Sequence, residues 1–126
     1  MSNKAGMGYV YIFFTIILTV YGQLAVKWGL ARYGVLPEPL LEKFFFLFKA
    51  IFSPIIFSGF VAAFMGSLCW MTVLSKFEIS YAYPFMSFAF ILVTVSSYFL
   101  FNESLSVYKV LGLLIIIVGI VVASKG

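Results

Sequence analysis

Four long stretches of this chain carry no charged residue, and they constrain its fold more than any other feature. A transmembrane helix needs about 20 mostly apolar residues. The first three stretches reach that length, and the fourth does so if residues 105–109 join it, with the Lys109 side chain extending to the membrane surface. The sequence therefore predicts an all-α integral membrane protein with a single four-helix domain. The expected transmembrane helices are residues 6–27, 53–75, 79–101 and 105–124.

The composition supports this fold class and excludes others. Of the 126 residues, 64% are hydrophobic and 10% are charged, whereas a soluble domain has about 25% charged residues. The net charge of +4 is spread over the ends of the apolar stretches, a distribution typical of contact with lipid phosphates. A nucleic-acid-binding protein would gather its basic residues on one soluble face, so we expect the lipid bilayer and no nucleic acid as a partner.

The residues that usually carry catalysis or bind metals are scarce. The chain has no histidine, no aspartate and a single cysteine, Cys69, within an apolar stretch. This composition excludes the common zinc sites and Ser-His-Asp triads. We therefore expect no enzyme, no catalytic residue, no metal site and no cofactor.

The first connection, between Lys27 and Lys49, is the longest in the chain. Pro37 and Pro39 interrupt it, and residues 40–52 follow with several polar side chains along one helical face. Two interpretations remain open for this segment. It is either an amphipathic helix at the membrane interface or an extension of the second transmembrane helix beyond the hydrocarbon.

The first predicted helix carries a row of polar side chains, each four residues after the last. The row consists of Tyr11, Thr15, Thr19, Gln23 and Lys27, and residues four apart lie on the same side of a helix. The row could form the wall of a hydrophilic groove, with Lys27 placed to meet a phosphate. Alternatively, the threonines donate hydrogen bonds to their own helix, Gln23 bonds to a neighbouring helix, and the Lys27 side chain extends to the membrane surface. For Gln23 and Lys27 we favour the groove-wall interpretation, because an amide beside a cation within the membrane costs free energy unless a partner group binds them.

The third predicted helix carries a line of hydroxyl groups. Ser80, Tyr83, Ser87, Thr94 and Tyr98 fall within roughly 60° of one another at about 100° per residue. We expect this line to form the opposite wall of the same groove. Pro84 lacks a backbone N–H and therefore predicts a hinge, as a kink in the first turn or as the start of the helix. Glu103, just beyond the helix, is expected either to cap the next helix or to contribute to a head-group site or gate.

Small residues mark the packing surfaces. In the second helix they form a stripe of Gly59, Ala62, Ala63, Gly66 and Ser67, a pattern that lets helices approach closely. Trp70 lies on the same side and could line a cavity or anchor the interface. In the fourth helix Gly112 and Gly119 are one heptad apart, which suits a helix–helix seam, including one between subunits.

Three fragments resemble known transporter sequences. They are residues 19–27, residues 79–87 and residues 101–112, and together they are similar to the drug/metabolite transporter superfamily. Within them, Gly-Gln-Leu-x-x-Lys at 22–27 and Ala-Tyr-Pro-x-x-Ser at 82–87 resemble the small flippase subunits for undecaprenyl-phosphate aminoarabinose. In the third fragment, Asn102 occupies the position where glycine is common in the Gly-Glu-x-Leu-type turn of the superfamily's repeat unit.

The resemblance implies a multi-pass transporter of the bacterial inner membrane that translocates a polyprenyl-phosphate-linked sugar or a similar lipid-linked head group. It also implies a homodimer, or a heterodimer with a second four-helix subunit, with the substrate between the two. In such a protein Gln23 and Lys27 would contact phosphate or sugar, and Tyr81, Tyr83 and Ser87 would line the groove. Trp70 and Glu103 would contribute to the head-group site or to gating.

Two alternatives remain. The small multidrug resistance family also has four helices, but its signature is a membrane glutamate eight residues before a lysine. Eight residues before Lys27 stands Thr19, which argues against proton-coupled efflux of hydrophobic cations. The second alternative is a non-transporting membrane subunit that assembles with another protein, and the small-residue stripes are compatible with it.

Overall fold

The computed structural model describes residues 2–126, with side chains from Gly6 onward. The elements in chain order are α1 (Ser2–Tyr33), α2 (Leu40–Ile51), α3 (Pro54–Lys76), α4 (Ile79–Ala82), the 3₁₀ turn η1 (Tyr83–Met86), α5 (Ser87–Phe101) and α6 (Val107–Ala123). Among the described residues, three helical segments are long and apolar enough to cross a membrane: Gly6–Tyr33, Pro54–Lys76 and Ile79–Phe101. The apolar helix α6 has 17 residues, which is the lower end of the length range of transmembrane helices, roughly 17–25 residues.

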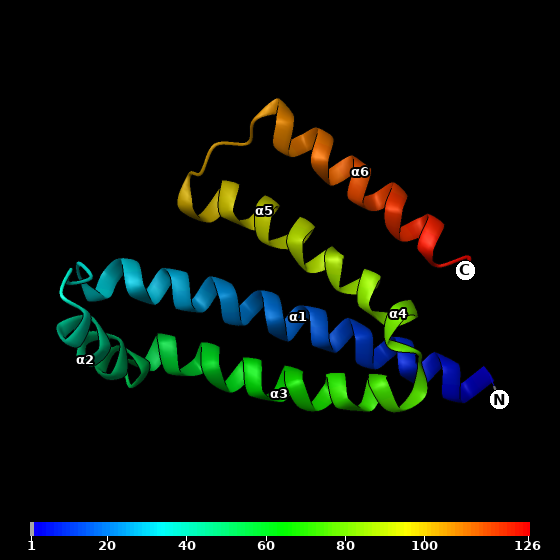
Figure 1. The fold of residues 1–126 in the computed structure, drawn as a ribbon, viewed down its shortest axis with the longest axis horizontal. Helices are drawn as coiled ribbons and strands as arrows, with labels where there is room; N and C mark the ends of the chain where they lie inside the picture. Colours follow the sequence, from blue (N-terminus) through cyan, green and yellow to red (C-terminus); the bar gives the residue numbers. More distant parts are fainter. Residues whose placement is uncertain (1) are drawn as a thin grey trace.

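Helices α1 and α3 run side by side in opposite directions and form the most extensive contact in the fold (Figure 1). Helix α5 lies on the other side of α1, and α6 follows it at the edge of the molecule (Figure 1). The N-terminal end of α1, the connection from α3 to α4 and the C-terminus all lie at one end. The opposite end holds α2 and the turn between α5 and α6.

Two glycines allow the close approach of α1 and α3. A Cβ atom on Gly22 would lie 2.9 Å from the carbonyl oxygen of Gly59, and a Cβ atom on Gly59 would lie 2.9 Å from the carbonyl oxygen of Gly22. Ala62 and Gly66, on the same face of α3, are buried. The prediction that the small residues of the second transmembrane helix form a packing surface is therefore confirmed for Gly59, Ala62 and Gly66, whereas Ala63 and Ser67 are exposed.

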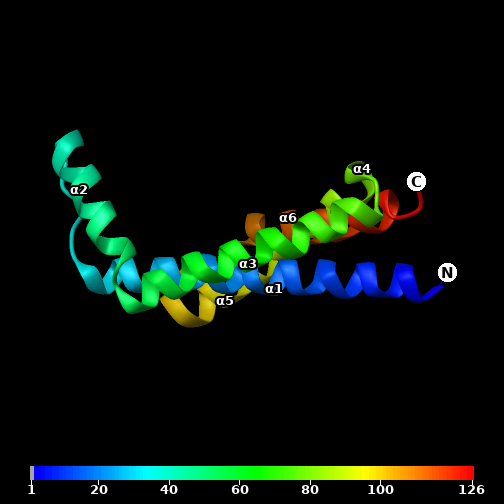
Figure 2. The same ribbon diagram turned by 90° about the horizontal axis from the view of Figure 1, so that it is seen from below.

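Helix α2 is separate from α3 and turns across the end of the α1–α3 pair (Figure 2). The break lies at Phe52 and Ser53, and Ser53 has an extended backbone directly before Pro54. A residue that precedes proline is driven away from helical geometry by the proline ring, while proline itself suits the first turn of a helix. The alternative that residues 40–52 extend the second transmembrane helix is therefore wrong.

The third spanning segment contains a 3₁₀ turn at its proline. Helix α4 begins at Ile79, and the turn Tyr83–Met86 joins it to α5. Pro84 cannot donate a hydrogen bond to the carbonyl of Ser80, which is why the regular helical pattern is interrupted there. Of the two alternatives for Pro84, the structure has an irregular first part of the helix rather than a start at the proline.

The turn from α5 to α6 corrects the expected role of Glu103 as a helix cap. Asn102 ends α5 in the left-handed region, with φ 54°, a conformation that asparagine tolerates better than most residues. The cap of α6 is Ser106, whose hydroxyl accepts a hydrogen bond from the backbone N–H of Lys109 at 3.2 Å. Glu103 lies three residues before this cap and makes a different contact, with α1.

Candidate functional site

The candidate site is a cavity of about 490 Å³ between α1, α3 and η1. Its α1 side runs from Thr15 to Val26, and its α3 side runs from Gly59 to Trp70. The cavity therefore extends for roughly 16 Å along the middle of α1, at about 1.5 Å per residue. The lining residues are Thr15, Thr19, Gly22, Gln23, Val26, Gly59, Phe60, Ala63, Gly66, Ser67, Trp70, Tyr83 and Met86.

The polar groups of the lining are uncharged, and some are bonded to their own helix. The buried Thr15 hydroxyl donates to the carbonyl of Tyr11 at 2.7 Å. The Ser67 hydroxyl donates to the carbonyl of Ala63 at 3.0 Å. The alternative that the threonines of the first helix donate hydrogen bonds to their own helix is therefore confirmed for Thr15. Gln23 is exposed at the cavity wall, where its amide can both donate and accept hydrogen bonds.

The aromatic side of the cavity is formed by Trp70 of α3 and Tyr83 of η1. Their rings meet edge to face with centroids 6.0 Å apart. Pro84 follows Tyr83 directly, so the interruption of the helix places this ring at the cavity. An indole and a phenol present apolar faces together with one polar group each, which suits a ligand that is partly sugar and partly hydrocarbon.

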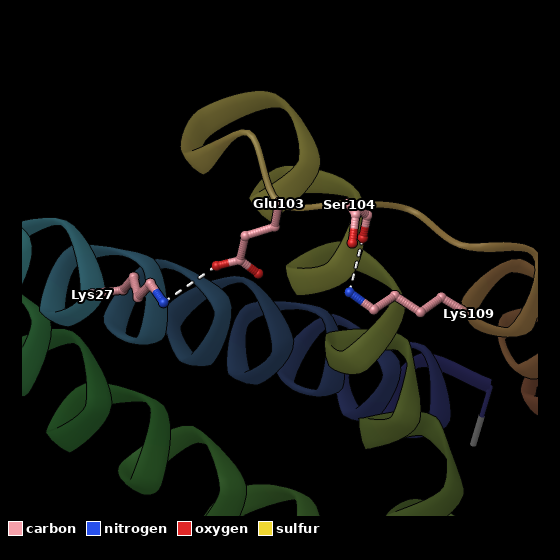
Figure 3. A network of polar contacts seen from close by, with 4 residues as sticks. All are labelled: Lys27, Glu103, Ser104 and Lys109. Atoms are coloured by element: carbon pink, nitrogen blue, oxygen red, sulfur yellow. Dashed lines mark hydrogen bonds and ion pairs between the residues drawn. The ribbon is translucent and has the colours of Figure 1, made fainter.

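Lys27 lies one helical turn beyond Gln23, at the end of the cavity nearer α2. Its ammonium group is 3.2 Å from the Glu103 carboxylate, and both side chains are partly exposed (Figure 3). The same ammonium lies 5.8 Å from the centre of the Phe101 ring. In the same turn, Lys109 donates from its ammonium to the carbonyl of Ser104 at 2.8 Å (Figure 3). The charge pair thus connects the turn between α5 and α6 to α1, one helical turn beyond Gln23, which lines the cavity.

The predicted site residues fall into three groups in the structure. Gln23, Trp70 and Tyr83 line one cavity, and Lys27 and Glu103 form an ion pair near it. Tyr81 and Ser87 lie outside the described cavity lining.

Tyr81 belongs to an aromatic cluster at the other end of the molecule. Its hydroxyl is hydrogen-bonded to the hydroxyl of Tyr9. The Tyr81 ring packs against Phe77 and Phe85, with ring centroids 5.6 and 5.4 Å apart. These contacts join the start of α1 to the region around η1. The structure thus gives Tyr81 a packing role that the sequence pattern did not indicate.

The wall opposite the polar row of α1 is α3, which corrects the expectation that the third transmembrane helix forms it. That helix reaches the cavity through Tyr83 and Met86 only, within the described lining. Thr94, further along α5, donates its hydroxyl to the carbonyl of Phe90 at 2.8 Å. Sequence reasoning missed Ser67, Ala63 and Gly66 as lining residues. The stripe of small residues could have indicated them, because small side chains allow two helices to pack closely and also leave open space beside the contact.

The fold and the cavity define a small, all-helical, multi-pass membrane protein with an uncharged polar site between its helices. Comparison with curated proteins gives the family. The chain is 32% identical over 120 residues to the probable 4-amino-4-deoxy-L-arabinose-phosphoundecaprenol flippase subunit ArnE of Hamiltonella defensa, covering 94% of this chain and 96% of that protein. It is 31% identical to the probable flippase subunit ArnF of Aeromonas hydrophila, over 95% of this chain and 81% of the relative.

A third relative, the probable flippase subunit ArnE of Pseudomonas aeruginosa (strain UCBPP-PA14), is 28% identical over 88% of this chain and 91% of its own length. The chain therefore belongs to the family of the ArnE and ArnF flippase subunits. No protein-family model matches the chain, and no solved structure matches it significantly.

Proposed function

We propose that this protein is a subunit of a flippase that moves a polyprenyl-phosphate-linked sugar, or a similar lipid-linked head group, across the bacterial inner membrane. The observation that carries the proposal is the cavity between α1 and α3, whose polar lining is uncharged and which has Lys27 one turn from Gln23. The names of the relatives, which specify an amino-sugar phosphoundecaprenol, support this choice of substrate.

In this proposal the lipid tail stays in the bilayer while the head group passes through the cavity. None of the lining residues that the structure describes is acidic, so a negatively charged phosphate meets no opposing carboxylate there. The Gln23 amide, the Thr19 hydroxyl and the Tyr83 phenol supply hydrogen bonds to sugar hydroxyls. The ring faces of Trp70 and Tyr83 cover the apolar side of the sugar. The protein contributes binding and orientation and makes no covalent bond.

Lys27 would receive the phosphate. Its present partner, Glu103, is partly exposed like Lys27 itself, and exposed ion pairs contribute little to stability, roughly 0–1 kcal/mol. A phosphate can therefore replace the carboxylate at little cost. We propose that Glu103 holds Lys27 between transport cycles and releases it when the head group arrives, so that both residues belong to the site.

The transporting unit is proposed to be a dimer, with this chain paired either with itself or with a second four-helix subunit. Helix α6 would complete the membrane domain as the fourth transmembrane helix. Its large apolar side chains Ile115, Val118 and Val122 are exposed. Around Gly112 and Gly119 nothing lies within 4 Å of the position that a Cβ atom would occupy. A second subunit against this face would cover these residues.

A translocation assay tests the proposal. Proteoliposomes carry the chain alone or together with a candidate second subunit, and an undecaprenyl-phosphate-linked amino sugar is placed in the inner leaflet. A membrane-impermeant amine reagent added outside measures how much substrate crosses. We expect rapid labelling with the wild type and labelling near the protein-free rate with Lys27→Ala or Gln23→Ala. Labelling at the protein-free rate by the wild type with every candidate partner would overturn the proposal.

A further inference from the structure

Helix α2 has one face that is apolar over its whole length and turned away from the rest of the chain. Its members are Leu40, Leu41, Phe44, Phe45, Leu47, Phe48 and, just beyond the helix, Phe52. Their side chains are between 40% and 81% exposed. At about 100° per residue they cover roughly 160° of the helix surface, and no charged residue falls within that sector. Such a continuous apolar face requires an apolar environment.

The opposite side of α2 attaches the helix to the protein. The Phe46 ring packs edge to face against the ring of Tyr33 at the end of α1, with centroids 5.0 Å apart. Ala50, one turn further on, is buried at 2% exposure. Glu42 and Lys49 lie at the border between the two sides: at about 100° per residue, Glu42 is roughly 40° from Phe46 and Lys49 is roughly 40° from Phe45. The helix is therefore amphipathic, and contacts within the chain fix which way each side faces.

We infer that α2 lies along the membrane–water interface with this apolar face inserted among the lipid acyl chains. The position follows from the connections: α2 joins two spanning helices at one end of the molecule, through residues 34–39 and residues 52–53. Figures 1 and 2 show it turned across that end and extending sideways. The apolar face is thus continuous with the lipid-exposed surface of the spans, where Phe57 and Phe64 of α3 are also exposed.

The charges nearby complement a lipid surface. Arg32, Lys43 and Lys49 lie at this end of the molecule and outnumber Glu38 and Glu42. Cations at an interface attract lipid phosphates, and their long aliphatic stems can lie along apolar surface while the charge stays in water. Interfacial helices typically combine this arrangement with aromatic and leucine side chains buried about 5–10 Å below the head groups.

This placement would set the depth of the candidate site. Tyr33, which contacts α2, follows Lys27 on the same helix by roughly 9 Å at about 1.5 Å per residue. With α2 at the interface, the Lys27 ammonium lies near the edge of the hydrocarbon, where lipid phosphates are within reach. The position of α2 itself does not depend on which substrate the protein carries.

Spin labels on single cysteines test the inference. In a Cys69→Ser background, labels are placed on the apolar face by Phe44→Cys, Phe48→Cys and Leu41→Cys and at its charged border by Glu42→Cys and Lys49→Cys. Phe64→Cys in α3 is the lipid reference and Lys125→Cys is the aqueous reference. The labelled proteins are reconstituted in vesicles, and collisions with oxygen, which partitions into lipid, are compared with collisions with a water-soluble nickel chelate.

We expect the labels at positions 41, 44 and 48 to show an oxygen-to-nickel collision ratio several-fold above those at 42 and 49 and close to that at 64. Ratios at 41, 44 and 48 close to the value at 125 would overturn the inference, because α2 would then lie in water. Labels shielded from both reagents would overturn it as well, because a second copy or another protein would then cover the face. Three separate labels on exposed positions keep the result independent of the folding of any single variant.

Discussion

The Lys27 ammonium lies 3.2 Å from the Glu103 carboxylate and so joins the end of α1 to the turn between α5 and α6. The two side chains are 60% and 40% exposed, which limits the contribution of the pair to stability. The pair is next to the cavity, one helical turn from Gln23. Its position therefore suits a contact that forms and breaks during transport better than one that holds the fold together.

Substitution of the two residues separates these roles. Lys27→Ala and Glu103→Ala should each lower the free energy of unfolding by no more than about 1 kcal/mol, because the pair is exposed. In the translocation assay, Lys27→Ala should abolish transport. Glu103→Ala should retain it and reach half-maximal rate at a lower substrate concentration, because no carboxylate competes with the phosphate. The measurements are thermal unfolding in detergent and the initial rate of amine labelling.

The double variant Lys27→Glu with Glu103→Lys is the control. It can restore the ion pair but moves the cation away from the turn next to Gln23, so we expect normal stability without transport. Full transport by the exchanged pair would show that the ion pair, rather than a phosphate contact of Lys27, is what the protein needs.

The contact between Gly22 and Gly59 predicts a large effect of added side chains. A Cβ atom at either position meets a backbone carbonyl oxygen at 2.9 Å, and a backbone atom cannot turn aside as a flexible side chain can. Gly59→Leu should therefore separate α1 from α3 and destabilise the protein by roughly 1–3 kcal/mol, the usual cost of overpacking. Thermal unfolding in detergent measures the change. Gly112→Leu and Gly119→Leu, where nothing lies within 4 Å of the added Cβ atom, are matched controls and should not destabilise the single chain.

Much of this fold follows from local patterns in the sequence. The spans follow from uncharged stretches, and the packing surface of α3 follows from the stripe around Gly59. Gln23, Trp70 and Tyr83, which the sequence predicts to bind substrate, line one cavity. Each of these predictions rests on information contained within one helix.

The pairing of helices could not be predicted in the same way. Polar rows on two helices indicate that both have a polar side, but not that the two sides face each other. The third transmembrane helix was expected opposite the row of α1, whereas α3 occupies that position. The Lys27–Glu103 pair was missed for the same reason, because the partners come from distant parts of the chain and no local pattern links them.

Asn102 offers a test of the turn that carries Glu103. Its backbone lies in the left-handed region at φ 54°, where a β-branched side chain is strained by roughly 1–3 kcal/mol. We expect Asn102→Val to lower the unfolding temperature and Asn102→Gly to leave it unchanged, since glycine adopts this conformation freely. Equal stability of the two variants would mean that the turn has another conformation in the membrane.

The position of the cavity predicts which serine matters for transport. Ser67 lines the cavity, whereas Ser87 lies outside its described lining. Ser67→Leu should fill part of the cavity and slow translocation at least tenfold, roughly 1.4 kcal/mol in barrier height. Ser87→Leu should leave the rate near that of the wild type. The reverse result would move the substrate path from the α1–α3 face to the α5 side of the molecule.

Pro84 is the residue through which the path could open and close. Replacing it with alanine restores a backbone N–H that can bond to the carbonyl of Ser80. Pro84→Ala should therefore convert η1 into regular helix and move the Tyr83 ring relative to Trp70. We expect a several-fold slower translocation without loss of thermal stability, and a changed distance between spin labels at positions 79 and 99. Pro54→Ala is the matched control, because a proline in the first turn of α3 replaces an N–H that has no helical partner. If both alanine variants transport at the same rate, Pro84 is not a hinge and the 3₁₀ turn serves only to position Tyr83.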